Sequence, residues 1–231
     1  MRKRAGSRFG LAAILAVAVA YAVMAQGPGW NQNAHYSLVR SRVTWRSTAS
    51  GVFVGSRCQF PAGTCSFDSR VSIPASARAV IHDGSGNLTV QRLTGPVSIT
   101  DESGNIIATA LSGGVRISDS SGDITGSSLG GPQVVIDDRS GGINIVRLTS
   151  TNVSASNDSG DITLVFSTVP DAVHVVDASG NVTVVLPRGN TAYNVTASTA
   201  SGQRTVSVPT NPSSPHVITV SNDSGDVTIR S

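Results

Sequence analysis

A short motif that recurs through residues 83–229 constrains the fold of this chain more than any other feature. Each copy holds Ser-Gly, then usually Asp or Asn, then an apolar residue and most often Thr, as in DSSGDIT and DASGNVT. Its glycines are Gly86, Gly104, Gly122, Gly141, Gly160, Gly180, Gly202 and Gly225. They follow one another at intervals of 18, 18, 19, 19, 20, 22 and 23 residues. One structural unit is therefore used again and again, with loops that lengthen toward the C-terminus.

Two short apolar alternations lie within each period, and both are typical of β-strands. One follows the Ser-Gly, as at residues 88–90, and the second comes about nine residues later, as at 97–99 and 115–117. No segment has the 3.6-residue apolar periodicity of a helix. A leucine precedes the second alternation in four periods, at Leu93, Leu111, Leu129 and Leu148.

Strands this short bury an apolar face only when neighbouring periods stack, so the repeats predict parallel, in-register ladders. The expected fold is all-β: a parallel β-solenoid of seven to eight turns of 18–23 residues, with glycine at a corner of every turn. The apolar positions expected to point inward are Leu88, Val90, Ile124, Ile162, Leu164, Val182, Val184, Val227 and Ile229. The positions expected to point outward are Thr89, Thr125, Thr163, Thr183 and Thr228.

The first 25 residues have the pattern of a secretory signal peptide. Basic residues at Arg2, Lys3, Arg4 and Arg8 precede an apolar run over 9–25, and small residues before Gln26 suit cleavage after Ala25. An uncleaved membrane anchor is the alternative, although the run is short for a spanning helix. We expect an exported protein, located in the periplasm, at the cell surface or outside the cell.

The basic character of the chain comes from this signal segment. Residues 26–231 keep 13 basic and 14 acidic groups, a net charge of −1, so charge gives no reason to expect nucleic acid as a partner. Their basic residues are all arginines, because the only lysine is Lys3, and this excludes mechanisms that need a lysine.

Residues 26–70 differ from the repeats and are expected to cap the first turn of a solenoid domain over 71–231. They contain six of the eight aromatic residues that follow the signal segment: Trp30, Tyr36, Trp45, Phe53, Phe60 and Phe67. Cys58 and Cys65 flank a Pro- and Gly-containing turn, and in an exported protein this indicates a disulfide. A free pair or half of a metal site is the alternative.

No group of residues suggests an active site, so we predict no catalytic residue, cofactor or metal ligand. The corner acids Asp83, Asp101, Asp119, Asp158, Asp177 and Asp223 are expected to serve turn chemistry, with a calcium ladder as the alternative. The four histidines, at positions 35, 82, 174 and 216, are scattered, and no nucleophile elbow is present. Four residues are weak candidates for a carbohydrate-active β-helix enzyme of the polysaccharide lyase kind: Arg116, Asp137, Asp138 and Arg139.

The repeats from about residue 71 to residue 230 resemble a bacterial family of adhesin-like β-solenoid domains of unknown function that is recognised by SGDI repeats. The resemblance implies an envelope or surface location and non-enzymatic, adhesin-like binding or scaffolding, with an envelope glycan or a surface protein as partner. A membrane is expected as a partner only through an uncleaved signal segment. Because the chain ends directly after its last repeat, self-association through an open C-terminal edge strand is also expected unless loops 187–199 or 207–217 fold back.

Overall fold

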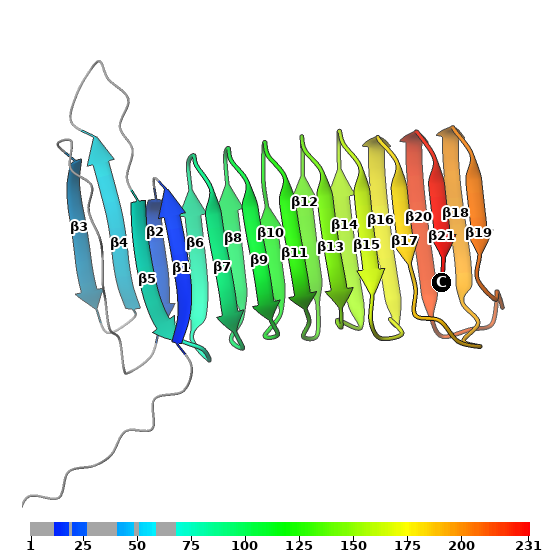
Figure 1. Cartoon of the computed structure of the whole chain (residues 1–231), viewed down its shortest axis with the longest axis horizontal. Coiled ribbons are helices and arrows are strands. Elements are labelled where there is room, and N and C mark those ends of the chain that lie inside the picture. The colour runs from blue at the N-terminus through cyan, green and yellow to red at the C-terminus, as the bar shows by residue number, and fades with distance from the viewer. Residues whose placement is uncertain (1–11, 19, 27–40, 49–50, 59–67) are drawn as a thin grey trace, which may run out of the picture.

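The described part of the chain is a straight stack of short strands, and the expected parallel β-solenoid is confirmed (Figure 1). The computed structural model describes residues 12–18, 20–26, 41–48, 51–58 and 68–231, with side chains from Val71 onward. Eight layers of two strands each form the solenoid: β6 (Arg78–Asp83) and β7 (Leu88–Leu93), β8 (Val97–Asp101) and β9 (Ile106–Leu111), β10 (Val115–Ser118) and β11 (Ile124–Leu129), β12 (Val134–Asp138) and β13 (Ile143–Leu148), β14 (Asn152–Asn157) and β15 (Ile162–Phe166), β16 (Ala172–Ser179) and β17 (Val182–Val185), β18 (Asn194–Ser201) and β19 (Arg204–Ser207), β20 (Val217–Ser224) and β21 (Val227–Arg230).

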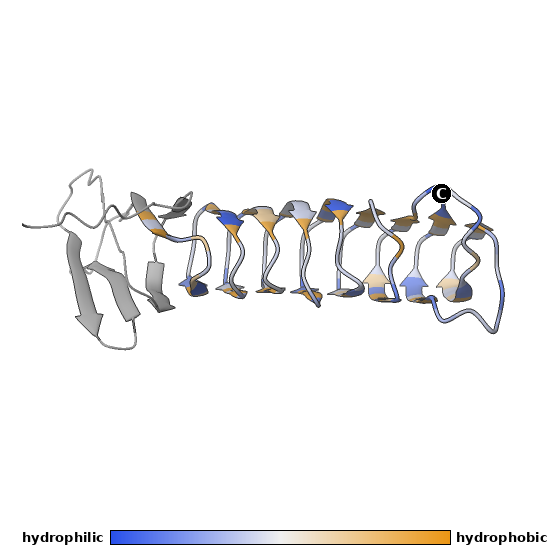
Figure 2. Ribbon diagram, turned by 90° about the horizontal axis from the view of Figure 1, so that it is seen from below, coloured by the Kyte–Doolittle hydropathy of each residue, from blue (hydrophilic) through white to orange (hydrophobic). Residues whose placement is uncertain are grey.

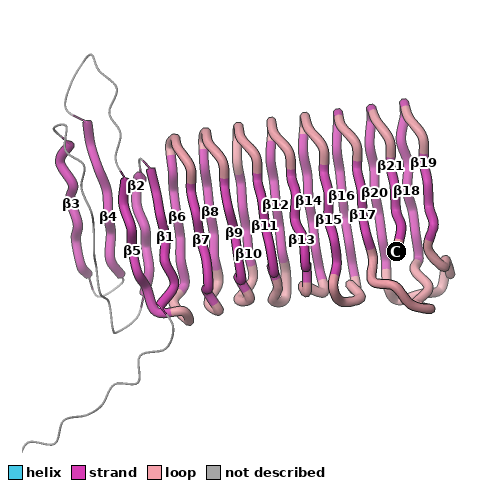
Figure 3. Tube along the Cα trace, viewed as in Figure 1, coloured by secondary structure: helices cyan, strands magenta, loops and turns pink. Residues whose placement is uncertain are grey.

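Two parallel sheets run the length of the rod, joined by a corner at one edge and a loop at the other (Figure 3). Sheet A contains β7 and the other odd-numbered strands of the solenoid, and sheet B contains β6 and the even-numbered strands. The register follows the repeat, so that Ile124 of one layer lies between Ile106 and Ile143 of its neighbours. Equivalent residues of the motif therefore form columns along the rod axis.

The core is a continuous apolar column between the two sheets. Figure 2 shows that apolar residues recur in the strands of both sheets. All nine positions that the sequence assigned to the interior are buried. The four leucines are buried as well, and each is the last residue of its sheet A strand. The residue before each leucine has a positive φ, and this shifts the inward–outward alternation so that the leucine points inward. These residues are Arg92 (59°), Ala110 (54°), Ser128 (56°) and Arg147 (57°).

Five further strands lie at the N-terminal end, and they pair with antiparallel geometry. They are β1 (Ala12–Ala18), β2 (Ala20–Gln26), β3 (Ser41–Thr48), β4 (Gly51–Cys58) and β5 (Asp68–Pro74). β1 joins sheet A beside β7, and β2 joins sheet B beside β6, so the expected signal segment lies against the first solenoid layer. The expected disulfide stays a prediction, because Cys65 lies outside the described residues.

The order of the last two layers differs from their order in the sequence. β20 and β21 lie between the layer of β16 and β17 and the layer of β18 and β19 (Figure 1). After β17, residues 186–193 lead past one layer position to β18 and β19, which form the last layer. Residues 208–216 then lead back, and β20 and β21 fill the position that was left open. These two long connections account for the two longest repeat intervals. The edge strands at this end are therefore β18 and β19, and the expectation of an open edge at the C-terminal strand is corrected.

No membrane-spanning candidate was found in the part of the chain that the structure describes, since it contains no helix of the required length and hydropathy.

Candidate functional site: corner columns and outward faces

The Ser-Gly glycines form a column in which each backbone lies on the next. A Cβ built on Gly122 would lie 1.8 Å from the carbonyl oxygen of Gly104, and one on Gly225 would lie 2.0 Å from that of Gly180. The φ of Gly122 is +140°, a conformation that residues with a Cβ rarely adopt. Both the stacking and the backbone conformation thus require glycine, so the most frequent motif of the sequence is structural.

A second ladder runs along the residues that follow the corner glycines, where Asp and Asn side-chain oxygens accept backbone N–H groups; Gly142, which follows Gly141, is an interruption. Oδ1 of Asn105 accepts the N–H of Asp123 at 2.9 Å, and Oδ1 of Asp123 accepts the N–H of Gly142 at 2.9 Å. The same bond recurs near the C-terminal end, where Oδ1 of Asp226 accepts the N–H of Gln203 at 2.8 Å. These oxygens connect one layer to the next, whereas the local turn bonds expected at the corners are made by the acids before Ser-Gly, such as Asp119, whose Oδ1 accepts the N–H of Ser120 at 2.7 Å. Among the residues described, no three His, Cys, Asp or Glu side chains are grouped to hold a metal ion.

A third column, three residues before each corner glycine, points into the rod. Its members, in spatial order, are Asp83, Asp101, Asp119, Asp138, Asn157, Asp177, Asn222 and Thr199. All except Thr199 are buried. The sequence interpretation placed Asp158 and Asp223 in this series, but both are exposed, and the buried positions are the asparagines that precede them. The constant spacing to glycine, rather than the identity of the residue, is the signal that would have found the column.

Burial dominates the electrostatics of these aspartates. The pKa of Asp83 is raised from 3.8 to about 7: burial is the largest cause, the charge of Asp101 adds to it, and the N–H groups of Ser85 and Gly84 act in the opposite direction. Burial likewise raises the pKa of Asp101, Asp119, Asp138 and Asp177. No cation offsets these shifts among the described residues, because the Arg116–Asp137 ion pair and the His216–Asp171 contact both lie outside the column.

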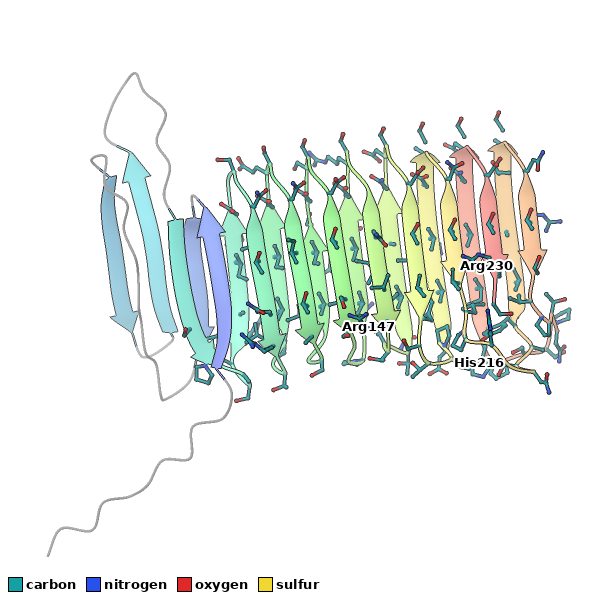
Figure 4. All side chains as sticks on the ribbon, in the orientation of Figure 1. Arg147, His216 and Arg230 are labelled. Carbon is teal, nitrogen blue, oxygen red and sulfur yellow. The ribbon has the colours of Figure 1, made fainter. Side chains whose placement is uncertain are left out.

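Contacts around His216 hold the loop of residues 208–216 at the C-terminal end of the rod (Figure 4). His216 Nδ1 lies 2.9 Å from the carbonyl oxygen of Pro170, so this nitrogen carries the proton, because a carbonyl can only accept. The hydroxyl of Ser214 donates to the carbonyl of Ala192 and accepts the backbone N–H of His216. The serine is thus engaged with the backbone, and these contacts fasten the loop instead of assembling a hydrolytic triad. The sequence, which shows only a scattered histidine, gave no signal for these contacts.

The four residues considered for a lyase do not gather on one surface. Arg116 and Asp137 form an exposed pair on sheet B, with 3.8 Å between Nη1 and Oδ2. Asp138 points into the rod and is 4 % exposed, whereas Arg139 is exposed at the corner. The adjacent acids Asp101 and Glu102 also separate, because the first is buried and the second is exposed.

The outward face of sheet A carries a column in which six of the eight residues are threonines. Its members, in spatial order, are Thr89, Ile107, Thr125, Asn144, Thr163, Thr183, Thr228 and Thr205. Ile107 is the most exposed large apolar residue of the described chain, at 44 %. The equivalent face of sheet B is more varied, since it includes Arg116, Val135 and His174.

The family comparison agrees with this repeat architecture. Residues 71–230 match the model of a family described as Toastrack DUF4097. The chain belongs to the Toastrack family. The match covers the eight layers and the second half of β5, and it indicates no enzymatic family. No curated protein and no solved structure matches this Toastrack chain.

Proposed function

We propose that this Toastrack protein is a non-enzymatic, exported component of the cell envelope or cell surface that acts as an adhesin-like binding or scaffolding rod. The observation that carries the proposal is the outward face of sheet A, where the layers present threonine at six of eight successive positions. Equivalent groups repeat about every 4.8 Å along this face. A surface of this kind suits a partner that is itself repetitive, such as an envelope polysaccharide.

The distribution of chemistry supports the same proposal. The corner glycines and the residues after them are engaged in stacking the layers, and the buried aspartates face the interior. Among the exposed side chains, those of the outward faces are arranged in continuous columns along the rod. Hydroxyl groups donate and accept hydrogen bonds without a net charge, which fits a neutral glycan or a protein surface.

Export is the second part of the proposal, and it rests on the N-terminal sequence. Cleavage after Ala25 would remove β1 and nearly all of β2, which lie beside β7 and β6. The N-terminal layer of the mature rod would then have edges free to pair with other residues or with a partner. Cell fractionation combined with N-terminal sequencing tests this: recovery of a chain that starts at Gln26 outside the cytoplasm supports export, and an intact cytoplasmic chain refutes it.

The binding proposal is tested with the purified protein on a panel of envelope polysaccharides and cell-surface fractions, with turnover of each glycan assayed in the same wells. Binding without turnover supports the proposal. Binding to none of them, or turnover of a glycan, refutes it. The lyase alternative gains no support from the geometry, since only Arg116 and Asp137 of its four candidates lie together on the surface.

A further inference from the structure

The buried column of aspartates and asparagines contains an unexplained feature. One carboxylate oxygen, Oδ2, of Asp83, Asp101, Asp119 and Asp138 is buried without a hydrogen-bond partner, and both oxygens of Asp177 are. In the first four of these aspartates the other oxygen, Oδ1, accepts a backbone N–H of the turn that follows; that of Asp138 accepts the N–H of Arg139 at 2.8 Å. Leaving a charged oxygen buried and unpaired is costly, so the column requires an explanation beyond turn chemistry.

The non-acidic members of the column show what the inward atom does. Nδ2 of Asn157 donates to the carbonyl oxygens of Gly141 and Gly160, at 2.9 Å and 3.1 Å. In the two layers at the C-terminal end, Nδ2 of Asn222 donates to Gly180 and Oγ1 of Thr199 donates to Gly225, each at 2.9 Å. Three different side chains thus place a donor against the carbonyl of a corner glycine.

The glycine carbonyls need such a donor. Backbone bonds between corners run from the N–H of seven of the eight corner glycines to the serine carbonyl of the adjacent layer, as from Gly104 to Ser121. They leave the carbonyl of the glycine itself without a backbone partner. In the described corners no backbone N–H is directed at a corner glycine carbonyl. A carboxylate has no hydrogen to offer there, whereas a carboxylic acid has one.

We propose that the buried aspartates of this column are neutral carboxylic acids whose Oδ2 hydroxyl donates to a corner glycine carbonyl, in the place that Asn157 and Asn222 fill with an amide. The acceptors in the preceding layers are the carbonyls of Gly86 for Asp101, Gly104 for Asp119, Gly122 for Asp138 and Gly160 for Asp177. The column makes the rod responsive to pH, because raising the pH removes the donor and introduces negative charge inside the stack.

The charges around the column reinforce this assignment. The groups that act electrostatically on these carboxyls are all acidic: neighbouring members of the column, and Glu102, Asp123, Asp158 and Asp161. The carboxyls have raised pKa values, so folding favours their protonated forms. Their contribution to the stability of the fold is fully present below the pKa of an unfolded aspartate, about 3.9. It is lost as the pH rises through the folded pKa, which is about 7 for Asp83.

The test compares the full chain with a variant carrying Asp101→Asn, Asp119→Asn and Asp138→Asn. We expect the urea midpoint of the wild type to fall between about pH 5 and about pH 9, and that of the variant to fall by at most about half as much. The variant should be the more stable protein at the higher pH. The matched control is Asp223→Asn, at an exposed acid beside Asn222, which should leave the pH profile unchanged.

Two further measurements keep the proposal falsifiable. Infrared spectra of the wild type near neutral pH should contain the C=O band of protonated carboxyl groups, and the triple variant should have less of it. The reverse substitution, Asn157→Asp, should fold normally at about pH 5 and lose stability by about pH 9. Absence of the infrared band, or a triple variant that is less stable at both pH values with an unchanged profile, would overturn the proposal.

Discussion

The corner column leads to a graded prediction for three glycines, each changed to alanine. Gly122 combines a positive φ with a Cβ position 1.8 Å from the Gly104 carbonyl oxygen. Gly114 has a φ of +89° but no atom closer than 3.7 Å. Gly142 has neither problem, since no positive φ restricts it and its nearest neighbour is an Asp123 oxygen at 3.4 Å. The three variants therefore separate steric overlap from backbone strain.

The expected magnitudes follow from these geometries. An unfavourable φ costs about 1–3 kcal/mol, which is the whole expected loss for Gly114→Ala. Gly122→Ala adds about 1–3 kcal/mol for overlap that only a separation of the layers can relieve, and it weakens corner bonds such as that from Gly122 N–H to the Ser140 carbonyl, at 2.9 Å. Its total loss is about 3–6 kcal/mol, a large part of the stability of a typical domain. Gly142→Ala should be neutral or stabilising by up to about 1 kcal/mol.

Urea unfolding followed by circular dichroism measures the three variants against the wild type. The reasoning requires the order Gly142→Ala, Gly114→Ala, Gly122→Ala from most to least stable. Equal midpoints for Gly122→Ala and Gly142→Ala would refute the stacked-glycine geometry. A larger loss at Gly114 than at Gly122 would show that φ strain, and not overlap between layers, is the reason for the repeated glycine.

Three further predictions test other columns. Gly142→Asn should stabilise the rod by about 1–2 kcal/mol in the same urea assay, because it restores the side-chain oxygen that this ladder lacks in one layer. Ala110→Gly should stabilise the rod by up to about 1 kcal/mol, because a residue with a Cβ is strained at a φ of 54°. The thermal midpoint should therefore rise, and a lower midpoint would contradict this. Paired cysteines at Thr183 and Thr228 should cross-link on oxidation, as mass spectrometry would show, whereas cysteines at Thr183 and Thr205 should not, because a layer separates them. Cross-linking of the second pair alone would mean that the layers stack in sequence order.

The repeat determined most of the fold in advance. Because the glycines recur at nearly constant intervals with apolar alternation between them, the sequence predicted the parallel register, the corners and the inward positions such as Ile124 and Val182. The same alternation predicted that threonines such as Thr163 and Thr183 lie on the outward face of sheet A. These features are local, so each repeat contains the information for its own layer.

Two features could not be predicted in this way. The insertion of β20 and β21 before β18 and β19 depends on which layer docks on which, and similar repeats carry no mark of their spatial neighbour. The positive φ before each leucine falls on Arg92 and Ala110 among others, residue types that give no sign of a left-handed conformation. Packing of the buried leucines, rather than local preference, selects it.

The candidate binding surface was predictable only in part. The threonines of sheet A could be assigned to an outward face, but Ile107 and Asn144 interrupt their column, and the sequence does not say which face a partner would choose. The closed loop around His216 depends on contacts between residues more than forty positions apart in the chain, such as that with Pro170.

Comparing the two faces tests the central claim most directly. One variant carries Thr163→Arg and Thr183→Arg on sheet A, and the other carries Ser154→Arg and His174→Arg on sheet B, both at outward positions of neighbouring layers. Binding to envelope polysaccharides and surface fractions is measured for each beside the wild type, with unfolding midpoints as the check on folding. The account predicts that the sheet A variant loses binding while the sheet B variant keeps it. Binding that survives the sheet A substitutions would contradict it.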